Sequence, residues 1–384
     1  MKRRRVLECL AIGVLVPAFF AALSHAAQDP QTQDRYLDRV SPGGPDVRLV
    51  VFNPETPCIR TLEVLRKNGN LNIPNLTVIG VYHARQTGNL AAARRYAREN
   101  GLEWLKFHEV SAEISGPVVF KKNACTPEFE AIAAKTDGAI FFGGPDLPPS
   151  LYGRKTNLGT VITDPYRHYL EASAVFHLLG GSQDPGAPAL LDSRPKFAIL
   201  GICLGHQTLN VGTGGTLIQD IWAEVYGKTS LEDAITLGPE QWHRNPYGLL
   251  LPADNVRNYS IHSLSLDEKG LFCTALGFKS SDQPTVLSSH HQAVGVLGKG
   301  FQPIAASLDG KVVEAIVHGK YGGVLGIQFH PDVLARDGEL PYRRRPGDPL
   351  TTYNALMAAT PSSVRFNEGV WTWLAARLVE SHGK

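Results

Sequence analysis

The chain has 384 residues, of which 38 are lysine or arginine and 36 are aspartate or glutamate, so its formal net charge is +2. This near balance excludes a dedicated nucleic-acid binder, which carries a strongly basic face. Hydrophobic residues make up 43% of the chain, which is typical of a globular protein with a substantial core. The run Arg343–Arg345 is therefore interpreted as part of a solvated loop.

The first residues differ from the rest of the chain. MKRRR is a positively charged segment, residues 6–23 are mostly apolar, and Ser24-His25-Ala26 is a small-residue cleavage site. This order predicts a secretory signal peptide over residues 1–26, followed by a polar linker over residues 27–46. The mature protein is then expected to be exported, either periplasmic or secreted. An uncleaved membrane anchor is the alternative reading of the same segment.

Cysteines are too few for a disulfide scaffold. Removal of the signal peptide would take Cys9 with it and leave Cys58, Cys125, Cys203 and Cys273. If Cys203 remains a thiol, the other three form at most one bridge, and the sequence does not decide which pair.

Strand-forming and helix-forming segments alternate after the linker. Asn100-Gly101 is a helix stop, and Asp164-Pro165 is a helix start. In chain order, the pattern predicts a strand at 47–53, a helix at 57–67, a strand at 76–83, a helix at 88–100, a strand at 103–110, a helix at 126–135, a strand at 138–144, a helix at 165–179 and a strand at 196–202.

This alternation predicts an α/β fold, a three-layer α/β/α arrangement around a mostly parallel sheet. Ligands of such sheets bind at the carboxyl ends of the strands. Two predicted strands end in glycine-rich turns, at Gly143-Gly144 and at Gly201–Gly205. We expect both turns at the same edge of the sheet, and we expect the functional site there.

Cys203 lies at a strand-to-helix turn with Gly201 and Gly205 two residues away on either side. Such a turn exposes a nucleophile at the sheet edge and brings backbone so close that only glycine fits. The positive end of the following helix favours a thiolate. The backbone N–H of Leu204 can bind an oxyanion, with a second donor expected from the backbone at Gly144. A buried structural cysteine between two turn glycines is the alternative.

His330-Pro331-Asp332 follows an apolar strand that begins near residue 324. Residues i and i+2 of an extended backbone point to the same side, so Asp332 can hold one ring nitrogen of His330 while the other faces Cys203. The proline favours an extended conformation at His330. Alone, this tripeptide also suits any turn that ends a strand.

Together, GICLGHQ (201–207) and GIQFHPD (326–332) resemble the class I glutamine amidotransferase superfamily and its Cys-His-Glu triad. More narrowly, five further blocks are similar to the γ-glutamyl hydrolases of peptidase family C26, especially to members that cleave γ-glutamyl-γ-aminobutyrate. The resemblance covers residues 137–335. The blocks are FFGGPDLPPSLYG, TDPYRHYLEAS, LNVGTGGTLIQDI, SSHHQAV and KVVEAIVH.

The resemblance implies a flavodoxin-like, class I glutamine amidotransferase-like fold in a single domain over residues 47–384. It implies Cys203 as nucleophile, His330 as general base and then acid, and Asp332 as orienting carboxylate. The oxyanion would bind to backbone N–H groups of Leu204 and the Gly143-Gly144 loop. The residues that would line the pocket for the glutamyl group are Gln207, His290, His291 and Gln292, although His290 and His291 also suit a packed pair at a strand end.

Two features depart from the family pattern. Asp332 stands where the family usually has glutamate, which is one methylene longer. Residues 47–125 contain more strand and helix than the family's usual opening and no motif of their own, so they form an extended N-terminal βα region.

Other candidate sites are weaker. GTGGT (212–216) follows a helix and is interpreted as a helix end and turn, not a dinucleotide loop. His206, His243 and His262 lack the spacing of metal ligands and are expected to be satisfied polar side chains. Neither metal nor cofactor is expected, because a thiolate, a base and an oxyanion hole suffice for acyl transfer. Asp164 is interpreted as a helix cap and Glu171 as a solvated residue.

The sequence therefore predicts an exported cysteine hydrolase that cleaves γ-glutamyl amides through a glutamyl thioester. Its partner would be a small-molecule γ-glutamyl substrate, with no nucleic acid and no membrane after signal cleavage. Two other functions remain open: a noncatalytic exported binding or sensor protein that retains the pocket, and the glutaminase subunit of an amidotransferase. The oligomeric state is undecided, and a homodimer remains open.

Overall fold

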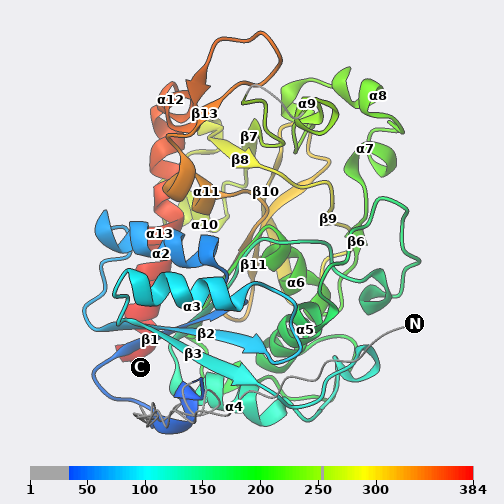
Figure 1. Ribbon diagram of the computed structural model, residues 1–384. Helices are drawn as coiled ribbons and strands as arrows, with labels where there is room; N and C mark the ends of the chain where they lie inside the picture. Colours follow the sequence, from blue (N-terminus) through cyan, green and yellow to red (C-terminus); the bar gives the residue numbers. More distant parts are fainter. Residues whose placement is uncertain (1–33, 252–254, 384) are drawn as a thin grey trace, which may run out of the picture.

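The computed structural model describes residues 34–251 and 255–383 (Figure 1). The expected signal peptide, residues 1–26, lies outside this part of the chain. None of the helices among the described residues combines the length and the apolar character needed to cross a bilayer.

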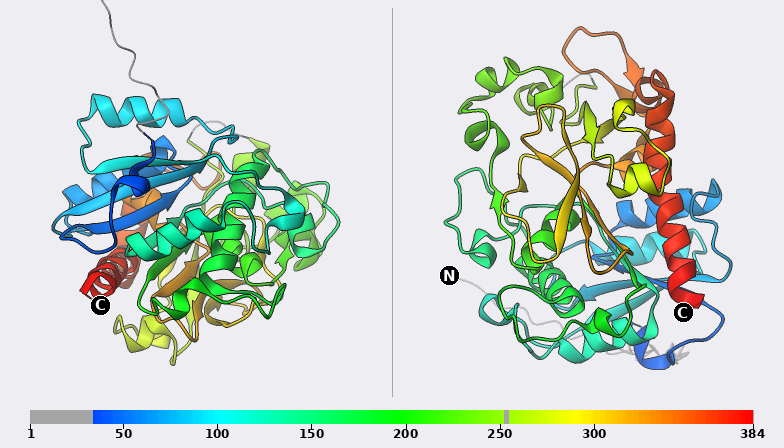
Figure 2. Two further views of the ribbon diagram at one scale, coloured as in Figure 1. Left: turned by 90° about the horizontal axis from the view of Figure 1, so that it is seen from below. Right: turned by 180° about the vertical axis from the view of Figure 1, so that it is seen from behind.

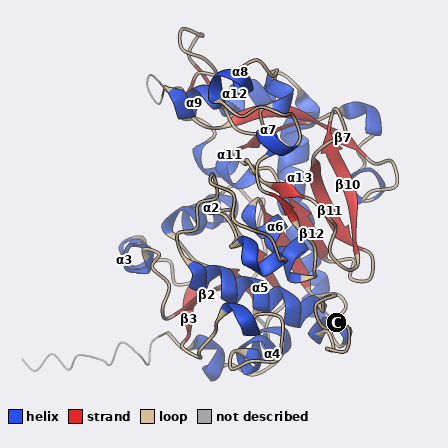
Figure 3. Ribbon diagram, turned by 90° about the vertical axis from the view of Figure 1, so that its right-hand side faces the viewer, coloured by secondary structure: helices blue, strands red, loops and turns tan. Residues whose placement is uncertain are grey.

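A ten-stranded sheet runs through the molecule in the order β3-β2-β1-β4-β5-β12-β11-β10-β7-β8. The first six of these strands pair in parallel, and the remaining neighbours pair antiparallel. The parallel strands are β1 (Val47–Phe52), β2 (Leu76–His83), β3 (Leu105–Val110), β4 (Gly138–Phe141), β5 (Ala198–Ile202) and β12 (Val324–Ile327). The antiparallel strands, which continue the sheet in Figure 3, are β7 (Ser260–Leu266), β8 (Thr285–Ser288), β10 (Phe301–Ser307) and β11 (Val313–His318).

Helices cover both faces of the parallel half. Alternate residues of a strand point to opposite faces, and in β1 Leu49 and Val51 belong to one core while Val50 and Phe52 belong to the other. The first core is covered by α2 (Thr56–Lys67), α3 (Leu90–Glu99) and the long α13 (Pro361–Gly383), drawn in red in Figure 2. The second is covered by α4 (Thr126–Lys135), α5 (Pro165–Leu179) and α6 (Leu204–Gly212).

Short elements fill the remaining connections. They are the helices α7 (Ile221–Glu224), α8 (Leu231–Ile235), α9 (Pro246–Leu250), α10 (Leu271–Thr274), α11 (Pro331–Asp337) and α12 (Tyr353–Ala358), and the strands β6 (Leu217–Ile218), β9 (Ala293–Val294), β13 (Pro341–Tyr342) and β14 (Thr351–Thr352).

The three-layer α/β/α prediction with a mostly parallel sheet is confirmed, and every strand and helix predicted over residues 47–202 is present within a few residues of its expected bounds. Residues 47–125 contribute β1, β2 and β3 to the same sheet as the rest. The extended backbone expected at Pro331 and Asp332 is wrong, because both residues lie in the first turn of α11. Proline suits that position, since it needs no N–H partner there.

Candidate active site

Cys203 connects β5 to α6 in a backbone conformation that is unusual for a residue with a side chain, with φ +52° and ψ −103°. A β-carbon on Gly205 would overlap the carbonyl of Phe141 in β4, and one on Gly201 would lie 2.6 Å from the carbonyl oxygen of Gly205. Both glycines are therefore required by the close approach of α6 to the sheet. Strain of this kind costs about 1–3 kcal/mol and is concentrated at functional sites.

His330 follows β12, which pairs in parallel with β5, so the two side chains leave neighbouring strands at the same edge. Its Nδ1 lies 3.0 Å from Oδ1 of Asp332. Gly143 lies between His330 and the cysteine: a β-carbon there would be 2.8 Å from Cε1 of His330 and 3.5 Å from Cβ of Cys203. The structure thus brings Cys203, His330 and Asp332 together, all less than 10% exposed.

Charges within this group stabilise one another. Burial by itself lowers the pKa of His330, but the neighbouring Cys203 sulfur and Asp332 carboxylate raise that pKa well above its ordinary value. Burial likewise opposes ionisation of Asp332, yet His330 and Arg336 hold the pKa of this carboxyl below its ordinary value. The arrangement places an imidazole with a raised pKa beside the sulfur of Cys203. The thiolate is the reactive form of a cysteine nucleophile.

Two backbone N–H groups near the sulfur are free to bind an oxyanion. Within the described chain, neither Leu204 N–H nor Gly144 N–H donates to another protein group. The orientation of the Gly143-Gly144 peptide is set by Arg167, whose Nη2 donates to Gly143 O at 3.0 Å and to Phe142 O at 3.1 Å. In a trans peptide the N–H points opposite to the C=O, so Gly144 N–H points away from this guanidinium.

Arg167 is fixed in turn by Glu171, one helical turn further along α5. Its Nε donates to Glu171 Oε1 at 2.8 Å, and the two side chains are 4% and 1% exposed. The prediction that Glu171 is solvated is therefore wrong, whereas Asp164 does cap α5 by accepting from Arg167 N–H at 3.2 Å. The sequence contained a signal for this pair. Its arginine and glutamate are four residues apart on a largely apolar helix, a spacing that lets the side chains meet.

The four residues predicted to line a glutamyl pocket lie in one region but in different environments. Gln207 is buried, and its Nε2 donates to Gln292 O at 3.3 Å and to Gln328 Oε1 at 3.2 Å. The side chain of Gln292 is buried without a hydrogen-bond partner among the described residues. His290 is buried among other histidines, away from solvent.

His291 is the one of these four side chains held between acids. Its Nε2 lies 3.0 Å from Asp146, in the loop after β4, and its Nδ1 lies 3.5 Å from Asp220. Burial lowers its pKa, but the two carboxylates outweigh burial and raise it. The two carboxylates therefore favour the protonated form of His291, whose ring is partly exposed near the loop that carries Asp146.

The expectation of satisfied histidines is wrong for His206 and His243, whose rings have no hydrogen-bond partner among the described residues. It holds for His262, whose ring lies 2.9 Å from the Ser288 hydroxyl. His243 and His262 meet His290 and Glu314 in one buried cluster. The four remaining cysteines of the described chain, Cys203 included, are all free thiols.

Comparison with known proteins identifies the family of this chain. The sequence profile of peptidase C26 matches residues 77–332, which include Cys203, His330 and Asp332. A Lactococcus lactis protein named "Putative glutamine amidotransferase-like protein YvdE" is 29% identical over 59% of this chain and 78% of its own length. A Mycobacterium tuberculosis protein named "Putative glutamine amidotransferase Rv2859c" is 31% identical over 50% of this chain and 49% of its own length. The match extends over two thirds of the chain, and the chain therefore belongs to the peptidase C26 family, with the hydrolase or amidotransferase role of such proteins.

Proposed function

We propose that this protein hydrolyses γ-glutamyl amide bonds through a glutamyl thioester on Cys203. The observation that carries the proposal is the group of Cys203, His330 and Asp332 at the carboxyl edge of β5 and β12, in a chain of the C26 family. In this proposal Cys203 is the nucleophile of the first step, His330 is the acid and base, and water is the nucleophile of the second step.

The proposed reaction has two steps, formation of the thioester and its hydrolysis. The Cys203 thiolate attacks the side-chain carbonyl carbon of the glutamyl group, and the oxyanion that forms binds to Leu204 N–H and Gly144 N–H. His330, oriented by Asp332 through Nδ1, donates a proton to the departing amine. His330 then takes a proton from water, which attacks the thioester and releases glutamate and the Cys203 thiolate.

A panel of γ-glutamyl amides tests this proposal on the purified protein. We expect glutamate release with the wild type and a loss of more than about 10⁴-fold in Cys203→Ala, the scale expected when a catalytic nucleophile is removed. Cys273→Ala, at another free thiol, is the matched control and should retain activity. Equal rates for Cys203→Ala and the wild type would overturn the assignment.

A glutaminase reaction is the second candidate, since relatives carry the name glutamine amidotransferase. The same thioester would then release ammonia from glutamine for an acceptor on a partner protein. Ammonia release that rises only in the presence of an ATP-using partner would favour this function over hydrolysis of the panel.

A binding or sensor function is the third candidate, because Asp332 replaces the longer glutamate of the family. Reaction with a γ-glutamyl electrophile, followed by mass spectrometry of the Cys203 peptide, separates it from catalysis. Ligand binding without an adduct would indicate a binder.

Export belongs to this proposal as well. The charged, apolar and small-residue segments of residues 1–26 support a cleaved signal peptide. N-terminal sequencing of the mature protein should begin after Ala26, and recovery of the intact N-terminus from cytosol would contradict export.

A further inference from the structure

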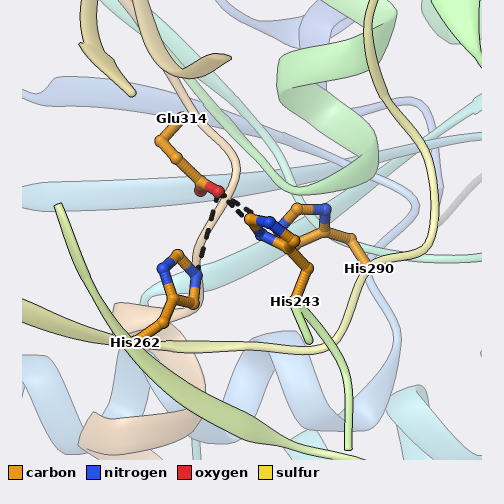
Figure 4. A group of neighbouring side chains, drawn as sticks. All are labelled: His243, His262, His290 and Glu314. Atoms are coloured by element: carbon orange, nitrogen blue, oxygen red, sulfur yellow. Dashed lines mark ion pairs between the residues drawn. The ribbon is translucent and has the colours of Figure 1, made fainter. Parts of the chain in front are cut away.

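Four metal-ligand side chains from four separate segments meet in the interior of the protein (Figure 4). His262 comes from β7, Glu314 from β11, His243 from the loop before α9 and His290 from the loop after β8. Each is no more than 3% exposed. Chain spacing does not indicate this cluster, since pairing of the antiparallel strands creates it.

The separations match those between the ligands of one tetrahedral ion. Oε1 of Glu314 lies 3.1 Å from Nδ1 of His243, 3.8 Å from Nε2 of His262 and 3.7 Å from Nε2 of His290. Tetrahedral ligands about 2.0–2.1 Å from zinc are about 3.3–3.4 Å from one another. The structure brackets this value, and all four ligand atoms lie within 4.8 Å of one another.

Several of these atoms lack a hydrogen-bond partner among the described residues. They are both carboxylate oxygens of Glu314, both ring nitrogens of His243 and Nε2 of His290. Although Nδ1 of His243 is close to the carboxylate, its direction does not make a hydrogen bond. Buried polar atoms are rarely left unpaired, because each costs about 1–3 kcal/mol.

The outer nitrogens of two rings are oriented as in metal-bound histidines. Nδ1–H of His290 donates to Gln292 O at 3.0 Å, and Nδ1–H of His262 can donate to Ser263 O at 3.3 Å. Each Nε2 then presents its lone pair to the cluster. Among the described residues, the Ser288 hydroxyl, 2.9 Å from Nε2 of His262, is the one donor that competes for a lone pair, and it can rotate away.

The charge of the cluster also favours a bound cation. Glu314 is fully buried. Within the described chain, no lysine or arginine pairs with Glu314. A buried carboxylate without a cation is strongly unfavourable.

His243 is also held at φ +54°, a conformation unfavourable for a residue with a β-carbon. Its own carbonyl accepts from His290 N–H at 3.1 Å, which ties the two loops together at the cluster. Strain at this residue is independent of the distances between the ligand atoms and is explained if the ring must reach a fixed position.

We propose that His243, His262, His290 and Glu314 bind one divalent transition-metal ion of the zinc type. Four protein ligands in a closed, buried position are characteristic of a structural site, not of a catalytic one that keeps a place for water. Through His290, the ion would be connected by hydrogen bonds to α6. Gln292 O accepts from both His290 and Gln207, and Gln207 lies one helical turn after Cys203.

Metal analysis of the wild-type protein, purified without chelators, is the first test. We expect about one equivalent of zinc or a similar ion per chain, or its uptake when Zn²⁺ is added. Replacement by Co²⁺ should produce the intense visible absorption of a tetrahedral site. Less than about a tenth of an equivalent, with neither uptake of Zn²⁺ nor a Co²⁺ spectrum, would overturn the proposal.

Variants then assign the ligands. Glu314→Gln and His243→Gln should each reduce metal content by more than about tenfold. The matched control is His318→Asn, on the same strand as Glu314, where the ring stacks on Tyr321 away from the cluster. This variant should keep its metal. Unchanged metal content in folded Glu314→Gln would contradict the assignment. If Glu314→Gln does not fold, the Co²⁺ spectrum of the wild type and the metal content of His243→Gln decide the assignment. None of these measurements depends on the proposed hydrolysis.

Discussion

Asp332 reaches His330 although its side chain is one methylene shorter than the glutamate usual in this family. The reason is local: His330 is the N-cap of α11, and Asp332 lies in the first turn of that helix. The helical turn brings the carboxylate back toward Nδ1, to 3.0 Å. The sequence pattern predicts an extended backbone here, in which residues 330 and 332 point to the same side of a strand. In the structure the helical turn gives the carboxylate its direction.

Asp332→Asn tests this contact. We expect kcat to fall by about 10²–10⁴-fold. The carboxylate stabilises the His330 imidazolium and fixes the tautomer of the ring, whereas the neutral amide of asparagine does neither. Burial lowers the pKa of His330, whereas Cys203 and Asp332 raise this pKa. Loss of the Asp332 charge should therefore lower the pKa of His330. Alkylation of Cys203 by iodoacetamide should therefore slow more at about pH 6 than at about pH 9, where a thiolate forms without the imidazolium.

The same shift affects stability with a defined sign. A histidine whose folded pKa is raised stabilises the protein below its unfolded pKa, about 6.5, and this stabilisation is lost as pH rises through the folded pKa. In Asp332→Asn the folded pKa of His330 is lower, so this stabilisation should be lost at a lower pH. Asp332→Glu keeps the charge and is the control. Identical alkylation profiles for Asp332→Asn and the wild type would show that the carboxylate does not act on His330.

At the scale of elements, α5 orients the loop after β4. Arg167 is buried on this helix, with Glu171 on one side and the carbonyls of Phe142 and Gly143 on the other. Burial raises the pKa of Glu171, and the arginine offsets part of that effect. Arg167 is thus a positioning residue for Gly144 N–H and does not itself contact the sulfur in the proposed mechanism.

Arg167→Met should lower the free energy of unfolding by about 3–5 kcal/mol, because Glu171 is left as a buried charge without a partner. The double variant Arg167→Met/Glu171→Met should recover most of this loss, since both charges are gone. It should still show a reduced kcat with KM less affected, because nothing holds the Gly143-Gly144 peptide. Urea unfolding and steady-state kinetics measure the two effects, and a double variant with wild-type kcat would contradict the positioning role.

At the scale of the whole molecule, α13 closes one face of the sheet with residues distant in sequence from the strands it covers. Leu374 and Leu378 are fully buried in the same core as β1, whereas Val379 on the same helix is 52% exposed. Gly138 in β4 has no side chain because a β-carbon there would lie 2.5 Å from Leu378 Cδ2. The last helix is therefore part of the core.

Leu374→Ala should lower the free energy of unfolding by about 2–5 kcal/mol through lost burial and the cavity left behind. Val379→Ala, on the exposed side of the helix, should change it by no more than about 0.5 kcal/mol. Both values come from urea unfolding of the same protein preparation. Equal effects of the two substitutions would mean that α13 does not pack as described.

Prediction from sequence succeeded for the parallel half and missed the antiparallel half. Among the parallel strands, β4 and β5 are continuous apolar runs that contain or adjoin glycine, so their pattern is visible locally. In contrast, β7 places serine and histidine at buried positions, and β10 contains Pro303, so neither shows the alternation typical of a strand. Their assignment needs the neighbouring strands with which they pair.

By itself, the sequence determined the order of strands and helices over residues 47–202, the cysteine turn and the His330-Pro331-Asp332 group, because each is recorded by residues adjacent in the chain. Tertiary structure alone decided that Arg167 orients Gly143 and that Glu314 meets three histidines. These contacts join segments far apart in sequence. They form because burying the apolar faces of the sheet brings polar side chains into the interior, where they must find partners among whatever the strand pairing places beside them.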